Sequence, residues 1–546
     1  MQIINDVFIK GCSIPYKLAA TPEVDLQTMF IRAAREVLQT TGTDPSHIRT
    51  VCIGTMGGFT NPPSEIGATV CDELGLEPYR VSQEKDTSST GASALFNAFQ
   101  EVAYGPTEEN CVLVLAGEQM YPAFPAGFQR TEKTRQIHRR YGLTMPLIGD
   151  MLENRLIYMS GFSREEWKNT IFPAMRKRKM ERGQKFRQGH FSGKTFDLEK
   201  FRNSPMITPN YARDTMVPQS SGVVAMILTN RRPEPVRGKV VRIRSVGQGF
   251  TSPLVTRRKG PLFFPEAVYR AIRQLCQRAG ISVQALQKTT CRFDHDAFKA
   301  IERIMGFILG GSEEQVVRDI LDGRNNPYGG LEISGHAIGA SGLLQVAQAF
   351  ILATEWQNYA EPTDFLPGSE SAGETESKPS AILCSSVGAA LTNLFFSFIE
   401  VYDEGQEIDH AYTFDPEEFD RVIPREGIFS EYESRLQNLH LGSHDGIVIS
   451  YTIPNRNLLE FSAEFDVWVN LVQTGSGKVL ALSRKELEIG DRVAFEDSGF
   501  PFRIIKRHAR RHGRRDPLSL DAFDLKPCSK SVARKIIREC EKILKQ

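Results

Sequence analysis

Four separated stretches of this sequence contain side chains that could do chemistry together. They are residues 86–95, 294–298, 326–331 with 335–342, and 384–388. A serine hydroxyl can attack a carbonyl carbon, and an imidazole with a near-neutral pKa can take up the proton that the hydroxyl releases. Each stretch is a weak or moderate signal alone, but their order and spacing together indicate one site.

The two histidines of these stretches are the first candidates. His336 stands in the sequence GHAIGASG of residues 335–342, and His295 stands in DHDAF of residues 294–298. Glycines allow a tight backbone that a ligand can approach closely. An isolated histidine is usually a core or turn residue, but two histidines in two such motifs favour function. We therefore expect His336 to move the proton of a nucleophile.

Structural interpretations compete for the other candidates. Ser88, Ser89 and Thr90 precede a helical pattern, and serine and threonine are favoured at helix N-caps. Cys384 fits equally well as a small buried apolar residue beside a strand, because free cysteines are commonly buried. Taken alone, the serines would be assigned to a cap.

The elements around these residues follow an α/β order that occurs twice. Helical periodicity at 25–40 precedes a short apolar strand at 50–54, and a helix at 91–102 precedes an apolar strand at 111–117. The second half repeats helix, turn and strand. Its expected elements are strands at 223–228 and 240–243, a helix at 265–279, a strand within 281–294, and strands at 381–384 and 391–400. The fold class is therefore α/β with two related halves.

Further segments flank these halves. An Arg- and Lys-rich stretch without strand signals indicates an inserted helical cap, a polar stretch at 369–380 indicates a loop, and short alternating segments after 403 indicate a small barrel. The basic run at 506–515 could bind phosphate or RNA but is more typical of a solvated linker. The predicted units are 1–245 with the cap at 121–218, 246–402, the barrel at 403–510, and a basic linker with a helix at 511–546.

Composition limits the possible partners. The 546 residues carry 67 Lys and Arg against 66 Asp and Glu, and 40% are hydrophobic, so we expect a multidomain globular protein without nucleic acid or membrane partners. The nine cysteines form no C-x-x-C pair, and the chain starts without a signal pattern, so a reduced, cytoplasmic protein is expected. The GTMGG segment at 54–58 lacks the Lys-Ser/Thr of a P-loop, so neither a nucleotide cofactor nor a metal is predicted.

Over about residues 1–400 the chain resembles the thiolase superfamily, most closely the sterol-carrier-protein-X type. GHAIGASG is similar to the family's GHPxGASG motif with Ala337 for proline, NPYGGL at 326–331 matches NPxGGL, and DHDAF stands where the family has an HDCF-like sequence. The resemblance implies the thiolase fold, with two βαβαβαββ halves in five αβαβα layers. The segment at about 430–505 resembles the OB-like barrels that accompany such proteins and bind or channel acyl-CoA, without their zinc-ribbon cysteines.

The same resemblance implies roles for individual residues. Ser88 occupies the position of the nucleophilic cysteine, three residues before Gly91, and His295 would orient a water or bind the thioester oxygen. Cys384 would be the acid and base for the incoming acceptor. The thioester would be bound by four residues of one motif: Gly335, Gly339, Ser341 and Gly342. The implied substrates are acyl-CoA or acyl-carrier-protein thioesters without a further cofactor, and the implied assembly is a homodimer, with a second thiolase-like subunit as another possible partner.

Serine at position 88 changes the expected chemistry. A thiol at a helix N-terminus readily becomes a thiolate, whereas Ser88 would need His336 to take its proton, and the resulting oxygen ester transfers its acyl group less easily. Three functions remain open: a serine-primed acyltransferase or condensing enzyme, a carbon–carbon lyase of the retro-aldol type that uses both histidines, and a non-catalytic acyl-CoA-binding subunit. Basic residues at 174–188 could grip CoA phosphates, but a solvated helical face is the simpler interpretation.

Overall fold

The computed structural model describes residues 4–19, 24–56, 65–120, 141–289, 291–356, 379–389, 391–439, 441, 445–452, 468–496, 502–507 and 529–546. Its centre is a mixed sheet of nine strands in the order β3-β2-β4-β5-β1-β6-β9-β8-β7. The strands are β1 (Phe8–Ser13), β2 (Ile48–Gly54), β3 (Arg80–Glu84), β4 (Cys111–Glu118), β5 (Gly222–Thr229), β6 (Lys239–Phe250), β7 (Cys291–Phe293), β8 (Ala381–Gly388) and β9 (Asn393–Asp403). The predicted α/β fold class is confirmed.

The two halves of the sheet share one topology. In the first half β4 pairs parallel with β2 and antiparallel with β5, which pairs antiparallel with β1. In the second half β8, β7, β9 and β6 repeat these pairings in the same order. The halves join where β1 meets β6: Phe8 pairs with Arg242, and the backbone N–H of Ile243 donates to the carbonyl of Val7 at 2.8 Å. The repeated helix–strand order of the sequence therefore corresponds to a repeated structural unit.

Helices cover both faces of each half in layers. The helices α1 (Leu26–Thr41) and α2 (Ile66–Leu74) pack on the outer face of the first half, and α10 (Glu266–Ala279) and α12 (Lys299–Ile308) pack on that of the second. Between the halves lie α3 (Thr90–Ala103) and α15 (Ser341–Thr354). Every residue of α15 is buried, as expected for a helix with apolar neighbours on all sides.

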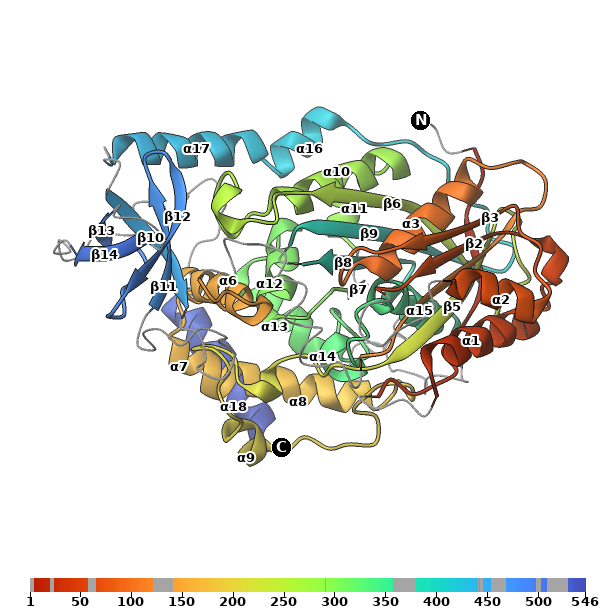
Figure 1. Cartoon of the computed structure of the whole chain (residues 1–546), viewed down its shortest axis with the longest axis horizontal. Helices are drawn as coiled ribbons and strands as arrows, with labels where there is room; N and C mark the ends of the chain where they lie inside the picture. The colour runs from red at the N-terminus through yellow and green to blue at the C-terminus, as the bar shows by residue number, and fades with distance from the viewer. Residues whose placement is uncertain are drawn as a thin grey trace.

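Shorter elements complete the core and the cap (Figure 1). They are η1 (Pro45–His47), α6 (Met145–Ser160), α7 (Arg164–Glu166), the π-helix η2 (Trp167–Ile171), α8 (Phe172–Gly183), α9 (Leu198–Arg202), η3 (Arg213–Thr215), η4 (Val255–Arg257), α11 (Val283–Gln287), α13 (Glu313–Asp322) and α14 (Gly330–Ser334). The cap is helical where the structure describes it, and residues 121–140 lie outside the described part. In its basic helix α8, Arg176 and Lys179 are buried, whereas Lys177 and Arg178 are partly exposed, so the expected solvated face is only part of the helix.

A closed five-stranded barrel lies at one end of the molecule's long axis (Figure 1). Its strands, in the order β10-β11-β12-β14-β13, are β10 (Asp445–Thr452), β11 (Trp468–Thr474), β12 (Gly477–Ser483), β13 (Arg492–Glu496) and β14 (Phe502–Arg507). Two helices precede it, α16 (Pro416–Val422) and α17 (Arg425–Asn438), so the segment predicted as barrel from residue 403 begins with helices. The OB-like identification stays a prediction.

Buried polar contacts hold the barrel against the cap helix α6. The Thr452 hydroxyl donates to Asp150 at 2.7 Å, and the Ser450 hydroxyl donates to the carbonyl of Met151 at 2.6 Å. Burial raises the pKa of Asp150 to about 6, against the hydrogen bonds that it accepts. The barrel is therefore docked on the core by specific contacts.

The last helix, α18 (Lys530–Lys545), returns to the cap and packs beside α8 (Figure 1). Most of the loop predicted at 369–380, from 369 to 378, and most of the basic run lie outside the described residues. Within the described ranges, no helix is long and apolar enough to cross a membrane, and the eight cysteines are all unpaired and buried.

Candidate active site

One small cavity brings together Ser88, His295 and His336. Its volume is about 30 Å³, room for about one water molecule. Ser88 precedes α3, His336 precedes α15, and His295 follows β7, so both halves contribute to it. The remaining walls are mostly apolar: Thr87, Met145, Val217, Ala297, Phe298, Ile301, Ile338, Val387 and Ala389. Three of the four residues predicted to be catalytic therefore line one cavity.

The turn before α3 presents Ser88 without engaging its hydroxyl. Thr87 has a φ of 53°, a left-handed conformation that is rare for a β-branched residue and stores strain. The turn is closed by its other members, because Thr90 Oγ1 donates to the carbonyl of Thr87 and Ser89 Oγ donates to that of Asp86, both at 2.7 Å. No described residue hydrogen-bonds the half-buried Ser88 side chain. The N-cap position belongs to Ser89, which leaves the Ser88 hydroxyl available.

His336 is held in a defined orientation. Its Nδ1 lies 2.6 Å from Ser341 Oγ, and that hydroxyl donates to the carbonyl of Ala337 at 3.3 Å. Because the Ser341 proton is directed to this carbonyl, we assign the imidazole proton to Nδ1, which leaves a lone pair on Nε2. Burial lowers the pKa of His336 to about 4, so the ring is neutral at pH 7. It can accept a proton through Nε2.

Acidification should destabilise the protein through His336. Its pKa is about 4 when folded and about 6.5 when unfolded, so the unfolded chain binds more protons between these values and stability falls as the pH falls through this window. We expect His336 alone to contribute roughly 3 kcal/mol of this loss between pH 7 and pH 4. Urea unfolding of the wild type and of His336→Asn across this range measures it. Identical pH dependence in both proteins would contradict the assignment.

His295 lies against His336 and is neutral as well. The ring centroids are 5.2 Å apart and nearly perpendicular. Burial, with a smaller contribution from His336, lowers the pKa of His295 well below its usual value. Its backbone N–H donates to Ser385 Oγ at 3.2 Å, and Ser385 Oγ donates to Asp294 at 3.0 Å. The cavity thus contains two neutral imidazoles, and Ser385 positions one of them.

A buried ion network supports the segment around His295. Lys179 Nζ of α8 donates to Asp296 at 2.8 Å and to Glu302 at 2.7 Å, and Asp296 also accepts the backbone N–H of Leu331 at 2.7 Å. Burial alone would lower the pKa of Lys179, but the facing carboxylates raise it. Burial raises the pKa of Glu302 to about 7. This role of Lys179 was not predicted from the sequence; the spacing of Arg176 and Lys179 on one helical face was the available signal.

The glycines of the predicted thioester-binding motif have a packing role. A Cβ on Gly342 would lie 2.5 Å from the backbone nitrogen of Ala92, and one on Gly339 would collide with the carbonyl of Gly117. Gly335 has a φ of 103°, and Ser341 orients His336. None of these four residues lines the cavity. They let the starts of α3 and α15 approach closely, which brings Ser88 and His336 to the same place.

Substitution of Gly342 tests this close approach. Gly342→Ala should separate α3 from α15 and destabilise the protein by roughly 1–3 kcal/mol, because backbone rather than a flexible side chain blocks the added methyl group. Gly427→Ala in α17 is the matched control, since its nearest neighbour would be Pro424 Cβ at 3.8 Å. Equal urea midpoints for the two variants would exclude the packing role.

Cys384 lies outside the cavity lining. It stands on β8, opposite Phe293 of β7, and its Sγ donates to the carbonyl of Gln345 in α15 at 3.7 Å. Burial raises the pKa of this thiol well above its usual value. Side chains alternate along a strand, so Ser385 and Val387 point toward the cavity and Cys384 points toward α15. Cys384 is therefore not among the residues that line the cavity with Ser88 and the histidines, whereas Ser385 contacts the backbone of His295.

Comparisons with known proteins give relatives at low identity. No family model matches the chain. It is 24% identical over 347 residues to an acetyl-CoA acetyltransferase of Methanocaldococcus jannaschii, covering 60% of this chain and 85% of that one. It is also 24% identical over 358 residues to an acetyl-CoA acetyltransferase of Methanothermobacter thermautotrophicus, covering 63% and 90%.

Two solved structures share its architecture. A monomeric SCP2-thiolase-like protein type 1 from Mycobacterium smegmatis superposes with a TM-score of 0.63 at 14% identity, covering 92% of this chain and all of that one. An Ltp2-ChsH2(DUF35) aldolase superposes with a TM-score of 0.58 at 15% identity, covering 74% and 100%. At these identities the likeness concerns the fold.

Proposed function

Because this chain has a thiolase-like fold, we propose that it is an acyltransferase or condensing enzyme that acts on acyl-CoA or acyl-carrier-protein thioesters through Ser88. One observation carries the proposal: Ser88 and His336 line the same cavity, and Ser341 holds His336 so that Nε2 keeps its lone pair. The similarity to two acetyl-CoA acetyltransferases supports the reaction class. No cofactor is needed, since the thioester itself is the activated donor.

The proposed reaction has two steps. Ser88 Oγ attacks the thioester carbonyl while His336 Nε2 takes its proton, and the proton then passes to the departing thiolate, leaving a seryl ester. His295, which lines the same cavity, would donate a hydrogen bond to the developing oxyanion. A second substrate then attacks the ester while His336 Nε2 takes the proton of that substrate, and the freed Ser88 oxygen recovers this proton from His336. The apolar walls accept the acyl chain, and the cavity must widen to admit it.

An acylation screen by intact mass tests the proposal. The protein is incubated with short, medium and β-keto acyl-CoA donors, and we expect an adduct of the acyl mass that peptide mapping places on Ser88. Hydroxylamine at neutral pH should leave this oxygen ester intact, whereas it would cleave a thioester formed on Cys384. Ser89→Ala, which removes only the neighbouring hydroxyl of the turn, should still form the adduct. Acylation elsewhere, or none with any donor, would refute the seryl intermediate.

A carbon–carbon lyase of the retro-aldol type is the second candidate function. The two imidazoles, whose ring centroids lie 5.2 Å apart in an apolar cavity, could serve this reaction without a covalent intermediate. His336 Nε2 would take up the proton of a substrate hydroxyl and then, with His295, donate a hydrogen bond to the enolate that forms. The likeness to a structure described as an aldolase agrees with it. This activity should survive Ser88→Ala and collapse in His336→Ala. A non-catalytic acyl-CoA-binding subunit would instead turn over no thioester and co-purify with a second thiolase-like chain.

We also propose that two copies of the chain associate through the edge strand β3. This strand ends the sheet, and Val81 on it is 44% exposed, which makes it a free edge available for pairing. Light scattering should give twice the chain mass for the wild type and a lower mass for Val81→Lys. A monomeric wild type at micromolar concentration would exclude the homodimer.

A further inference from the structure

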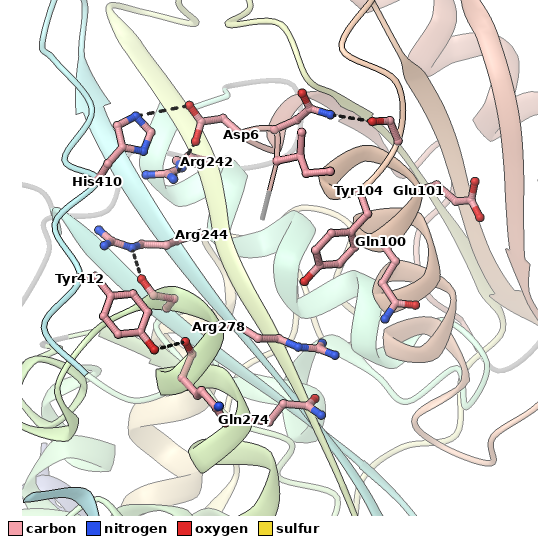
Figure 2. A pocket seen from close by; sticks show the side chains of 15 residues that line it. Asp6, Gln100, Glu101, Tyr104, Arg242, Arg244, Gln274, Arg278, His410 and Tyr412 are labelled. Atoms are coloured by element: carbon pink, nitrogen blue, oxygen red, sulfur yellow. Dashed lines mark hydrogen bonds and ion pairs between the residues drawn. The ribbon is translucent and has the colours of Figure 1, made fainter. Parts of the chain in front are cut away.

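A second cavity, of about 1130 Å³, lies at the opposite end of α3 from Ser88. Figure 2 shows it between the last turns of α3 and α10 and the start of β6. Because α3 has 14 residues at about 1.5 Å each, roughly 20 Å separates the two cavities. This second cavity is therefore independent of the proposed reaction.

Two of the three arginines that line this cavity are neutralised. Arg242 pairs with Asp6 at 2.7 Å and with Glu400 at 3.2 Å, and Arg244 pairs with Glu400 at 2.9 Å. Arg244 also donates to the carbonyl of Ala279 at 2.8 Å. Asp6 and Glu400 therefore compensate the charges of these two arginines. The charge of the third arginine remains to be considered.

Arg278 of α10 is that third arginine, and it has no counter-ion among the residues that the structure describes. Its Nη1 donates to the carbonyl of Val246 at 3.2 Å, and its guanidinium lies 5.1 Å from the ring centroid of Phe96. No carboxylate among the described residues lies within ion-pair distance of it; Glu101 at the cavity rim is paired with Arg80. Partial burial lowers the pKa of Arg278, because it disfavours the charged form. An anion in the cavity would relieve this cost.

Other hydrogen-bond donors converge on the same place. In Figure 2 Arg278 extends from α10 toward Gln100 and Tyr104 of α3, with Gln274 beside it. Gln274 Oε1 already accepts the backbone N–H of Gln248 at 2.8 Å, so its amide NH₂ is the group left to face the cavity. A guanidinium, a phenol and amide groups together can surround the oxygens of an anion.

We propose that this cavity binds the oxyanion of a small organic molecule, a carboxylate or a phosphate, with Arg278 as the bidentate partner. The planar guanidinium matches two oxygens of either group. The cavity is of the size that holds drug-sized or cofactor-sized ligands, so most of the bound molecule would be the organic part attached to the anion. Arg242 and Arg244, already paired, would form the polar wall around it.

Thermal-shift and calorimetric titrations of the full chain test this site. The probes are inorganic phosphate, glycerol 3-phosphate, acetate and citrate at constant ionic strength. They are applied to the wild type, Arg278→Gln, Tyr104→Phe and the control Arg257→Gln, whose side chain is exposed outside this cavity. We expect saturable binding of at least one probe, at least tenfold weaker in Arg278→Gln, several-fold weaker in Tyr104→Phe and unchanged in Arg257→Gln. Ser88→Ala should bind as the wild type does, so failure of the proposed acyl chemistry would leave this result untouched.

The outcomes separate the possible ligands. Saturation by phosphates alone would identify a phosphorylated ligand, and saturation by carboxylates alone would identify an organic acid. The proposal is overturned if no probe saturates, or if binding is equal in the wild type and Arg278→Gln. Should Arg278→Gln fail to fold, Tyr104→Phe keeps the comparison, and unchanged affinity in that variant would overturn the proposal as well.

Discussion

Ser88→Ala should reduce acyl transfer by about 10³-fold or more while leaving the fold intact. The expected effect is large because the substitution removes the hydroxyl group on which the proposed intermediate forms. The turn should survive, since Thr90 and Ser89 close it and no described residue hydrogen-bonds the Ser88 side chain. The measurement is kcat with the donor that acylates the wild type, together with the urea midpoint of both proteins.

Ser88→Cys gives the complementary result. A thiol at the start of α3 can ionise, so we expect an adduct that forms faster than on serine and that neutral hydroxylamine cleaves. Ser89→Ala should keep wild-type acylation and lose only about 1 kcal/mol of stability from the turn. Full activity in Ser88→Ala together with loss of activity in His336→Ala would contradict the seryl intermediate and support the lyase mechanism.

Local periodicity was sufficient to predict much of the fold. The helix expected at 91–102 is observed at Thr90–Ala103, and the strand expected at 111–117 at Cys111–Glu118. Both are strongly patterned and lie in the repeated core, where local and tertiary preferences agree. The helices before the barrel, α16 and α17, were not predicted, because α17 has only a narrow apolar face made of Ile428, Phe429 and Tyr432.

The candidate site was predicted less completely, because it depends on which face each residue presents. A resemblance in sequence selected Cys384, but strand alternation turns that residue toward α15 and gives its neighbour Ser385 the contact with His295. Lysine is usually a surface residue, and the burial of Lys179 is explained by three carboxylates that face it. They belong to Asp296 before α12, Glu302 in α12 and Glu332 in α14. Such pairings join residues more than a hundred positions apart, so spacing along the chain does not reveal them.

Lys179→Met should therefore be strongly destabilising, by about 3–5 kcal/mol, because it leaves buried carboxylates without their shared cation. Asp296, Glu302 and Glu332 all lie within 3.4 Å of Lys179 Nζ, whereas Lys299 contacts only Glu332 among them. Glu302 should then hold its proton above the wild-type pKa of about 7. Since the unfolded chain releases that proton from about pH 4.5 upward, the variant should lose further stability as the pH rises from 5 to 8.5.

A second substitution tests whether charge or packing causes this loss. Lys179→Met with Glu302→Gln removes the charge of Glu302 and leaves Asp296 as the carboxylate without a cation. The glutamine oxygen can still accept the amide of Asn326, which now donates to Glu302 at 2.9 Å. We expect the double variant to recover at least half of the lost stability and to lose the added pH dependence. Urea unfolding at pH 5, 7 and 8.5 measures both effects. If the double variant were no more stable than Lys179→Met, the loss would come from packing around α8. Recovery of stability would show that the ion pairs of Lys179, a residue of the cap helix α8, hold the segment that carries His295.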